Sequence, residues 1–104
     1  MNSREEILSK IKSVVLEEIP DAKVYLFGSR VTGKIHEESD WDILVLTDQE
    51  YPKSVSKTID EKLFSLSISV VSVFSFIITT KDKWKNDPSY YSLQLGIADQ
   101  FISL

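Results

Sequence analysis

Two aspartates separated by one residue form the pair in this chain whose spacing best suits metal chemistry. Asp40 and Asp42 stand at the start of an apolar run that extends to Leu46 and is typical of a strand. Residues i and i+2 of a strand point to the same face, with Cα atoms roughly 6–7 Å apart, so both carboxylates could bind one or two Mg²⁺ ions. Such ions stabilise the attacking and leaving oxygens of a phosphoryl-type displacement. Taken alone, an Asp-x-Asp pair is better explained as two solvated carboxylates at a strand entrance.

A second motif, Gly28-Ser29-Arg30, follows a short apolar strand and makes the metal interpretation more specific. A strand that ends in Gly-Ser and leads into a helical turn exposes backbone amides to which an anion can bind. Gly28 permits close approach of a phosphate, Ser29 can donate a hydrogen bond, and Arg30 can add a charged donor. An ordinary strand-to-helix turn is the alternative. A phosphate turn and a carboxylate pair on neighbouring strands together predict adjacent anion and metal sites.

The rest of the chain has the patterns of helices and strands that could position these two motifs. A capping box at Ser3–Glu6 and Pro20 bound the first helix, and Pro52 can open the second. The long apolar run Ile68–Ile78 is rich in Val, Ile and Phe, which favours a strand. The expected elements, in order, are a helix at about Arg4–Glu18, a strand over Lys23–Phe27, a turn at Arg30–Thr32, a strand over Trp41–Leu46 buried on both faces, a helix beginning at Pro52 with Val55, Ile59, Leu63 and Leu66 on its apolar edge, a strand over Ile68–Ile78, a short helix capped by Thr80, and a last helix within Ser89–Leu104.

Composition limits the classes of protein to which the chain can belong. Its 104 residues, 42% of them hydrophobic and 27% charged, fit one globular domain over residues 1–104. A net charge of −4 argues against duplex nucleic acid as a partner. The absence of cysteine excludes disulfides and thiolate metal sites. The N-terminus has no signal-peptide pattern, and the longest apolar run is too short for a membrane helix, so we expect a cytoplasmic protein with no membrane partner.

The two motifs together resemble the signature of the polymerase-beta-like nucleotidyltransferase superfamily, in particular its minimal nucleotidyltransferases. The resemblance rests on Gly28-Ser29-Arg30-x-x-Gly33 and Ser39-Asp40-Trp41-Asp42. It also extends to the order of the elements from Arg4 to Ile78. It implies an α/β (α+β) nucleotidyltransferase fold, in which a small mixed β-sheet is flanked by helices.

The resemblance also implies an activity and a set of site residues. Members of the family transfer a nucleoside monophosphate from a nucleoside triphosphate, here expected to be ATP, to an acceptor hydroxyl. Gly28 and Ser29 would bind the triphosphate with Arg30 and Ser39 close by, and Asp40 and Asp42 would hold Mg²⁺. Trp41, between the aspartates, should point into the core. Minimal family members are commonly paired with a helical HEPN-type protein, sometimes as toxin and antitoxin.

One departure from the family pattern opens an alternative function. Active members usually carry a third carboxylate on the next strand, whereas Ile68–Ile78 contains neither Asp nor Glu. The alternative to an enzyme is therefore a catalytically impaired nucleotide-binding, antitoxin-like subunit that acts with a HEPN-type partner. A plain α/β domain with a coincidental motif is the third reading. Since no acceptor-binding domain follows the core, the acceptor site would need a second subunit or a homo-oligomer.

Other polar residues are weaker candidates for a role in the site. His36 and Lys34, in the loop before the aspartates, could contact a phosphate, although lone loop residues are more often simply solvated. The lysines around Trp84 resemble an aromatic-basic cluster, but a solvated helix face explains them equally well.

Overall fold

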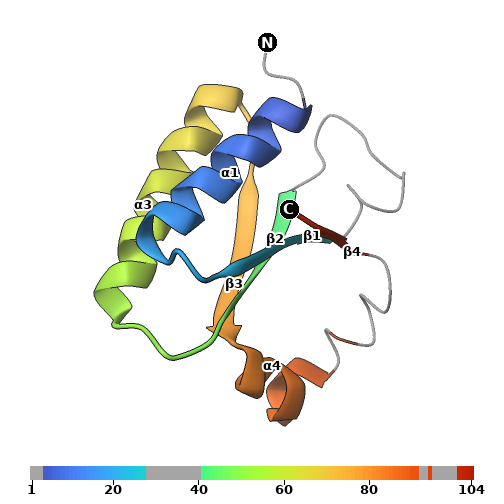
Figure 1. The fold of residues 1–104 in the computed structure, drawn as a ribbon. Coiled ribbons are helices and arrows are strands. Elements are labelled where there is room, and N and C mark those ends of the chain that lie inside the picture. Colours follow the sequence, from blue (N-terminus) through green and yellow to red (C-terminus); the bar gives the residue numbers. More distant parts are fainter. Residues whose placement is uncertain (1–3, 28–40, 92–93, 95–100) are drawn as a thin grey trace.

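The computed structural model describes residues 4–27, 41–91, 94 and 101–104, and its strands form one mixed four-stranded sheet. The strands are β1 (Lys23–Phe27), β2 (Trp41–Thr47), β3 (Phe74–Thr80) and β4 (Phe101–Ser103), in the order β3-β2-β1-β4. β2 pairs with β1 in the antiparallel sense and with β3 in the parallel sense, and β4 is antiparallel to β1. The helices α1 (Arg4–Glu18) and α3 (Lys53–Val70) lie side by side over one face of this sheet (Figure 1).

The first helix and the first strand begin and end where the sequence predicts. Ile7, Ile11 and Val15 recur at helical spacing and are all buried, so α1 packs its apolar side on the sheet. The helix ends two residues before Pro20, which can neither donate a helical hydrogen bond nor follow a helical residue easily.

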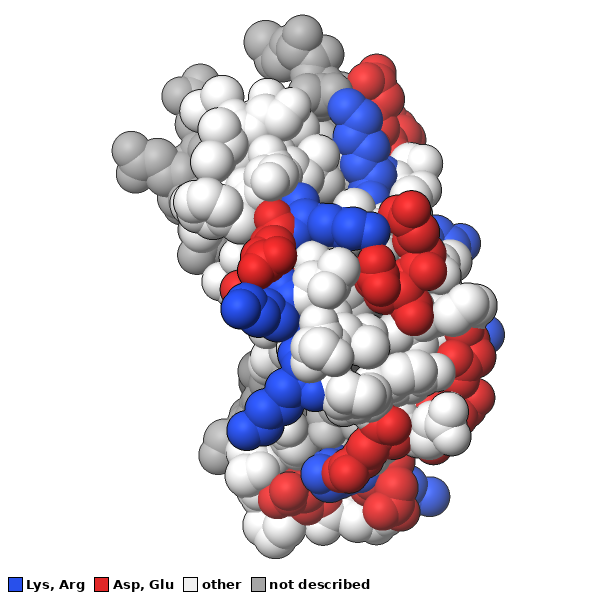
Figure 2. Space-filling view, turned by 90° about the vertical axis from the view of Figure 1, so that its left-hand side faces the viewer, with Lys and Arg blue, Asp and Glu red and all other residues white. Residues whose placement is uncertain are grey.

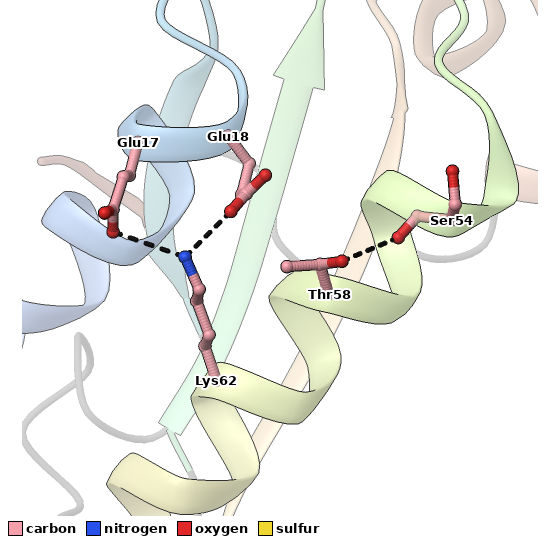
Figure 3. A network of polar contacts seen from close by, with 5 residues as sticks. All are labelled: Glu17, Glu18, Ser54, Thr58 and Lys62. Atoms are coloured by element: carbon pink, nitrogen blue, oxygen red, sulfur yellow. Dashed lines mark hydrogen bonds and ion pairs between the residues drawn. The ribbon is translucent and has the colours of Figure 1, made fainter.

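A charged contact joins the two long helices at their solvent-facing edge. Lys62 of α3 donates to Glu18 at 2.8 Å and to Glu17 at 3.4 Å, both in the last turn of α1 (Figure 3). The hydrogen bond and charge of Glu18 raise the pKa of Lys62 above its ordinary value. The pair therefore helps to align α1 and α3, although ion pairs this exposed contribute little to stability.

The main core lies between the two helices and the sheet. It contains side chains from α1 and α3 and alternate residues of β1 and β2, as the period of two in a strand requires. Val24 and Leu26 face the helices from β1, and the β2 side chains on the same face are Trp41, Ile43 and Val45. Leu44 and Leu46, which point to the other face, are also buried, so the prediction that β2 is buried on both faces is confirmed.

The predicted strand over Ile68–Ile78 is wrong in its first half. Residues up to Val70 continue α3, Val71 ends it in a left-handed conformation with φ 54°, and β3 begins only at Phe74. Leu66 and Val70 extend the apolar stripe of α3 onto the core. Burial of that stripe outweighs the β propensity of the β-branched residues. Pro52 precedes the helix as its N-cap rather than occupying its first position.

The predicted helix within Ser89–Leu104 is wrong at its two ends, although Tyr91 and Gln94 between them are helical. Pro88–Tyr90 forms a single 3₁₀ turn, η1, and Phe101–Ser103 forms β4 on the outer edge of β1. The ladder continues beyond β4, since the Leu104 amide donates to the Val24 carbonyl at 2.8 Å. Long-range pairing with β1 thus sets the conformation of the C-terminal residues.

The short helix α4 (Lys81–Asn86) confirms the predicted Thr80 cap. The Thr80 hydroxyl accepts from the Lys83 amide at 3.0 Å. Two of the lysines of α4 form ion pairs, Lys81 with Asp48 at 2.6 Å and Lys83 with Glu50, which favours the solvated-face reading. Acidic and basic side chains are likewise interspersed over the helical side of the molecule (Figure 2). No helix among the described residues is long and apolar enough to cross a membrane.

Candidate functional site

The structure places Asp42 in the second position of β2, between the end of β1 and the start of β3. Its partner in the antiparallel ladder is Phe27, the last residue of β1, and its partner in the parallel ladder is Ser75. Gly28 follows Phe27 directly in the chain and Asp40 directly precedes Trp41. The residue before Gly28 and the residue after Asp40 therefore lie at the same end of the sheet. The interpretation as a phosphate turn beside a metal pair requires this arrangement.

Trp41 fixes the direction in which the Asp42 side chain points. Trp41 is only 2% exposed and packs edge-on against Phe74, with ring centroids 6.4 Å apart. Its backbone amide donates to the carbonyl of Val73 at 2.9 Å, which ties the first residue of β2 to the turn before β3. Since successive strand residues alternate between faces, Asp42 points to the sheet face opposite α1 and α3. The prediction that Trp41 points into the core is confirmed.

The environment of Asp42 suits an oxygen ligand of a divalent ion. Its side chain is half-buried, and the exposed Ser75 is next to it on the same face of the sheet. Carboxylate oxygens are hard ligands of the kind Mg²⁺ prefers, and Mg²⁺ is usually held by one or two carboxylates together with substrate phosphates. No cluster of three or more His, Cys, Asp or Glu side chains that could hold a metal occurs within the described ranges. Asp42, the member of the predicted carboxylate pair that the structure describes, therefore has the chemistry that such an ion requires.

Most of the residues predicted for the site lie outside the described part of the chain. These are Gly28, Ser29, Arg30, Ser39 and Asp40, together with the weaker candidates Lys34 and His36. Asp42 is the member of the predicted set that the structure describes. The roles of all these residues, including Asp42, remain predictions.

The register of the sheet identifies one residue that the sequence alone did not single out. A third carboxylate on the strand after the metal pair would have to lie next to Asp42, and Ser75 has that position. β3, now bounded as Phe74–Thr80, contains no Asp or Glu. The sequence contained three serines within the predicted strand, and only the ladder with β2 distinguishes Ser75 from Ser69 and Ser72.

A family model described as a nucleotidyltransferase domain matches residues 8–89. This match covers most of the chain, including both motifs and the elements from most of α1 to the end of α4. The chain belongs to the nucleotidyltransferase domain family. The fold, a mixed sheet with helices over one face, agrees with this assignment.

Two curated relatives of this nucleotidyltransferase-domain chain are named as protein adenylyltransferases. The probable protein adenylyltransferase MntA of Haemophilus influenzae is 33% identical over 49 residues, which cover 47% of this chain and 43% of that protein. The protein adenylyltransferase MntA of Aphanizomenon flos-aquae is 48% identical over 44 residues, covering 41% of this chain and 29% of that protein. The chain thus spans less than half the length of the curated relatives it matches.

A solved complex contains a chain with the same fold. It is described as a tri-AMPylated HEPN toxin of Shewanella oneidensis in complex with the MNT antitoxin. The TM-score is 0.62 at 19% identity, over 97% of this chain and 71% of the matched one. At this identity the likeness establishes the fold.

Proposed function

We propose that this chain transfers AMP from Mg²⁺-bound ATP to a hydroxyl group of a protein partner. The observation that carries the proposal is the register Phe27–Asp42–Ser75, which brings the end of the strand leading into Gly28-Ser29 beside the carboxylate of Asp42. The family match and the names of the MntA relatives support the reaction type and the protein acceptor.

Each proposed site residue has a role that follows from its chemistry. Gly28 and Ser29 bind the triphosphate through backbone amides and the serine hydroxyl, and Arg30 and Ser39 contribute donors nearby. Asp40 and Asp42 hold Mg²⁺ through their carboxylates. When bound, the ion supplies positive charge that stabilises the oxygens of the transferred phosphoryl group.

The packing around β2 contributes to this reaction by preorganising Asp42. The buried Trp41 ring and the hydrogen bond from its amide to Val73 fix the start of β2. A metal-coordinating side chain that is already in place loses less conformational entropy when the ion binds. Precise placement of this carboxylate therefore favours binding of the metal-nucleotide complex.

A helical HEPN-type protein is the acceptor partner we propose. The structural neighbour from Shewanella oneidensis is described as an AMPylated HEPN toxin in complex with its antitoxin, which supports a partner of this kind. A partner that supplies both the acceptor hydroxyl and the rest of the acceptor site would complete the reaction.

A second function, nucleotide binding without turnover, is favoured by one observation. The residue next to Asp42 on β3 is Ser75, and β3 contains no Asp or Glu that could serve as a third carboxylate. Serine is a weak base compared with a carboxylate and cannot activate an acceptor hydroxyl in the same way. In this case the chain would be an antitoxin-like subunit that binds ATP and its partner but transfers nothing.

One experiment tests both candidates. The full chain is co-expressed with a candidate helical HEPN-type protein, and the purified proteins are incubated with ATP and Mg²⁺ while the mass of the candidate partner is followed. Asp42→Asn should lower the rate of AMP transfer by at least about a hundredfold, because losing a metal ligand forfeits several kcal/mol of transition-state stabilisation.

The matched control is Asp48→Asn, which removes an exposed carboxylate at the other end of the sheet and should leave transfer unchanged. Transfer that persists in Asp42→Asn would refute the enzymatic proposal. No transfer by the unaltered chain, together with a rise in its Tm on adding Mg²⁺ and ATP that Asp42→Asn abolishes, would establish the binding function instead.

A further inference from the structure

The strand β3 forms an open edge of the sheet. In the order β3-β2-β1-β4 it has β2 on one side, and no described residue pairs with its other side. All seven of its residues, Phe74–Thr80, are uncharged, none is proline, and the ladder with β2 runs through them without a bulge. Edge strands of soluble proteins are usually shortened, charged or bulged, which keeps other strands from pairing with them. β3 is protected in none of these ways, so its outer N–H and C=O groups are available to another strand.

An exposed apolar surface lies beside this edge, on the second half of α3. Phe64 and Ile68 are 66% and 64% exposed. A groove of about 200 Å³ joins Phe64 to Phe74 and Phe76 of β3, along which α3 runs (Figure 1). Lys62, two residues before Phe64 and turned about 200° from it on the helix, reaches α1, so Phe64 is on the side of α3 away from α1. Large apolar side chains gathered beside an unpaired strand mark an interaction surface.

The sequence of β3 is self-complementary when the strand is paired antiparallel with a second copy of itself. With Ile77 opposite Ile77 of the second copy, Phe76 lies opposite Ile78, and Ser75 lies opposite Thr79. Pairs of aromatic with β-branched residues and of hydroxyl with hydroxyl stabilise antiparallel neighbours, whereas like charges opposite one another destabilise them. Since β3 contains no charged residue, this pairing brings no like charges together.

The symmetry of such a pair also joins the apolar surfaces of the two helices. A two-fold axis perpendicular to the sheet brings the two β3 edges together and keeps the helices of both copies on the same face, so α3 lies beside α3. Phe64 shares a groove with Phe76, which is one residue from Ile77 on the axis, so Phe64 lies near its counterpart. A standard interface buries about 800 Å² per partner, more than the edge of one seven-residue strand provides, and the exposed surface of α3 supplies further area.

We propose that β3 is the interface of a homodimer, in which two copies of this chain pair antiparallel about Ile77 and join their sheets into one. Phe64 and Ile68 of each copy pack at this interface beneath solvent. The interface occupies the long open edge of both copies, so assembly ends at two chains. Because Ser75 lies opposite Thr79 of the second copy, the second copy borders the candidate site at Asp42.

The first test is sedimentation equilibrium of the full chain over a range of concentrations. We expect the mass of two chains at high concentration and dissociation on dilution. Phe64→Glu should raise the Kd of the dimer at least about tenfold without lowering the Tm of the dilute chain, because it places a charge in the apolar contact twice per dimer. Ser65→Glu is the matched control, since the exposed Ser65 puts the same charge on the same helix but is turned away from β3. If Phe64→Glu does not fold, Ile68→Glu replaces it with the same expected result.

The second test is cross-linking through a single introduced cysteine, which the cysteine-free chain makes specific to one position. Residues directly opposite in an antiparallel pair have Cα atoms about 4.5–5.5 Å apart, within the range of a disulfide. Ile77→Cys should therefore form a disulfide-linked dimer under mild oxidation. Ser75→Cys is the control: Ser75 is exposed on the same face of β3, but its two copies would be roughly 13 Å apart.

Three outcomes would overturn the proposal. The first is the mass of a single chain at every concentration. The second is a dimer that Phe64→Glu and Ser65→Glu affect equally, or in which Ile77→Cys and Ser75→Cys cross-link to the same extent, because the copies would then meet through another face. The third is a chain that is monomeric alone and whose Ile77→Cys variant cross-links to a co-expressed helical protein, which would assign this edge to that protein instead.

Discussion

Asp42 and Ser75 are register partners in the parallel ladder of β2 and β3, so their side chains lie next to each other on the sheet face opposite the helices. Neighbouring strands are about 4.8 Å apart, which is close enough for both residues to bind one ion. A carboxylate can therefore be placed beside Asp42 by a single substitution at position 75.

Ser75→Asp should create the third carboxylate and raise the rate of Mg²⁺-dependent AMP transfer. A positioned general base contributes at least about a hundredfold, which sets the scale of the gain expected if the rest of the site is intact. Two like charges on neighbouring strands repel, so the variant should have a lower Tm in EDTA and recover it on adding Mg²⁺. Transfer rates and thermal unfolding with and without Mg²⁺ measure both effects.

Ser75→Asn is the control for this prediction, because it matches the shape of aspartate without its charge. It should neither raise transfer nor show the recovery of Tm with Mg²⁺. If Ser75→Asp and Ser75→Asn behave alike in both assays, position 75 does not belong to the metal site.

Ile11→Ala should destabilise the fold by about 2–5 kcal/mol, the usual cost of removing a buried large aliphatic side chain. Ile11 is fully buried between α1 and the sheet. Val14→Ala, on a partly buried position of the same helix, is the control and should cost clearly less. Urea unfolding measures both values, and equal losses would mean that α1 does not pack as described.

The parts of the fold that the sequence predicted correctly are those governed by local signals. The apolar stripe of α1 is followed by Pro20, and the apolar and aromatic run of β1 lies directly before Gly28. Thr80 caps α4 as predicted. In each case a periodic pattern coincides with a cap or a breaker, so neighbouring residues alone determine where the element begins or ends.

The two wrong predictions concern elements that depend on distant contacts. Ile68–Val70 resemble a strand in composition, yet the helix that contains them packs its stripe on the core. Phe101–Ser103 become a strand only because β1 offers an open edge for pairing. The helical spacing of that stripe does continue to Val70 in the sequence, but composition alone favours a strand there, and no local pattern indicates the pairing of Phe101–Ser103 with β1.

The candidate site was predictable where it depends on local patterns and not where it depends on contacts between distant residues. The two motifs and the inward direction of Trp41 follow from strand periodicity, whereas Ser75 emerged only from the register of β2 with β3. A cavity at the opposite end of the sheet, where β2 and β3 end, draws its lining from β2, β3, α3, α4 and η1, and no short pattern joins these segments. Sites assembled from several elements need the tertiary structure.

Asp87→Asn should lower Tm at neutral pH, and the difference from the unaltered chain should vanish in acid. Hydrogen bonds from the backbone and side chain of Ser89 hold the pKa of Asp87 below its ordinary value of 3.8. A carboxyl whose folded pKa is lowered contributes its stability above the unfolded value and loses it as the pH falls through the folded value. The contribution is therefore complete at pH 7 and declines below about pH 4.

Thermal unfolding of both proteins at several pH values between 7 and 3 checks this prediction. Asn retains an acceptor for the Ser89 amide, which lies 2.9 Å from the Asp87 carboxylate, so Asp87→Ala serves as the comparison that removes the cap altogether. A difference between Asp87→Asn and the unaltered chain that stays constant down to pH 3 would contradict the assignment.

Val71→Gly should stabilise the protein by up to about 1 kcal/mol, although it removes a side chain. Val71 ends α3 with φ 54°, a conformation that costs a residue with a Cβ roughly 1–2 kcal/mol and costs glycine almost nothing. The side chain is 88% exposed, so little packing is lost, and the greater entropy of glycine in the unfolded chain offsets about half of the gain. Val73→Gly is the matched control: Val73 is 59% exposed, follows in the same turn and is not at positive φ, so its replacement by glycine should destabilise. Urea unfolding should therefore give changes of opposite sign for two valines two residues apart, and a loss of stability in both variants would show that φ at Val71 is not strained.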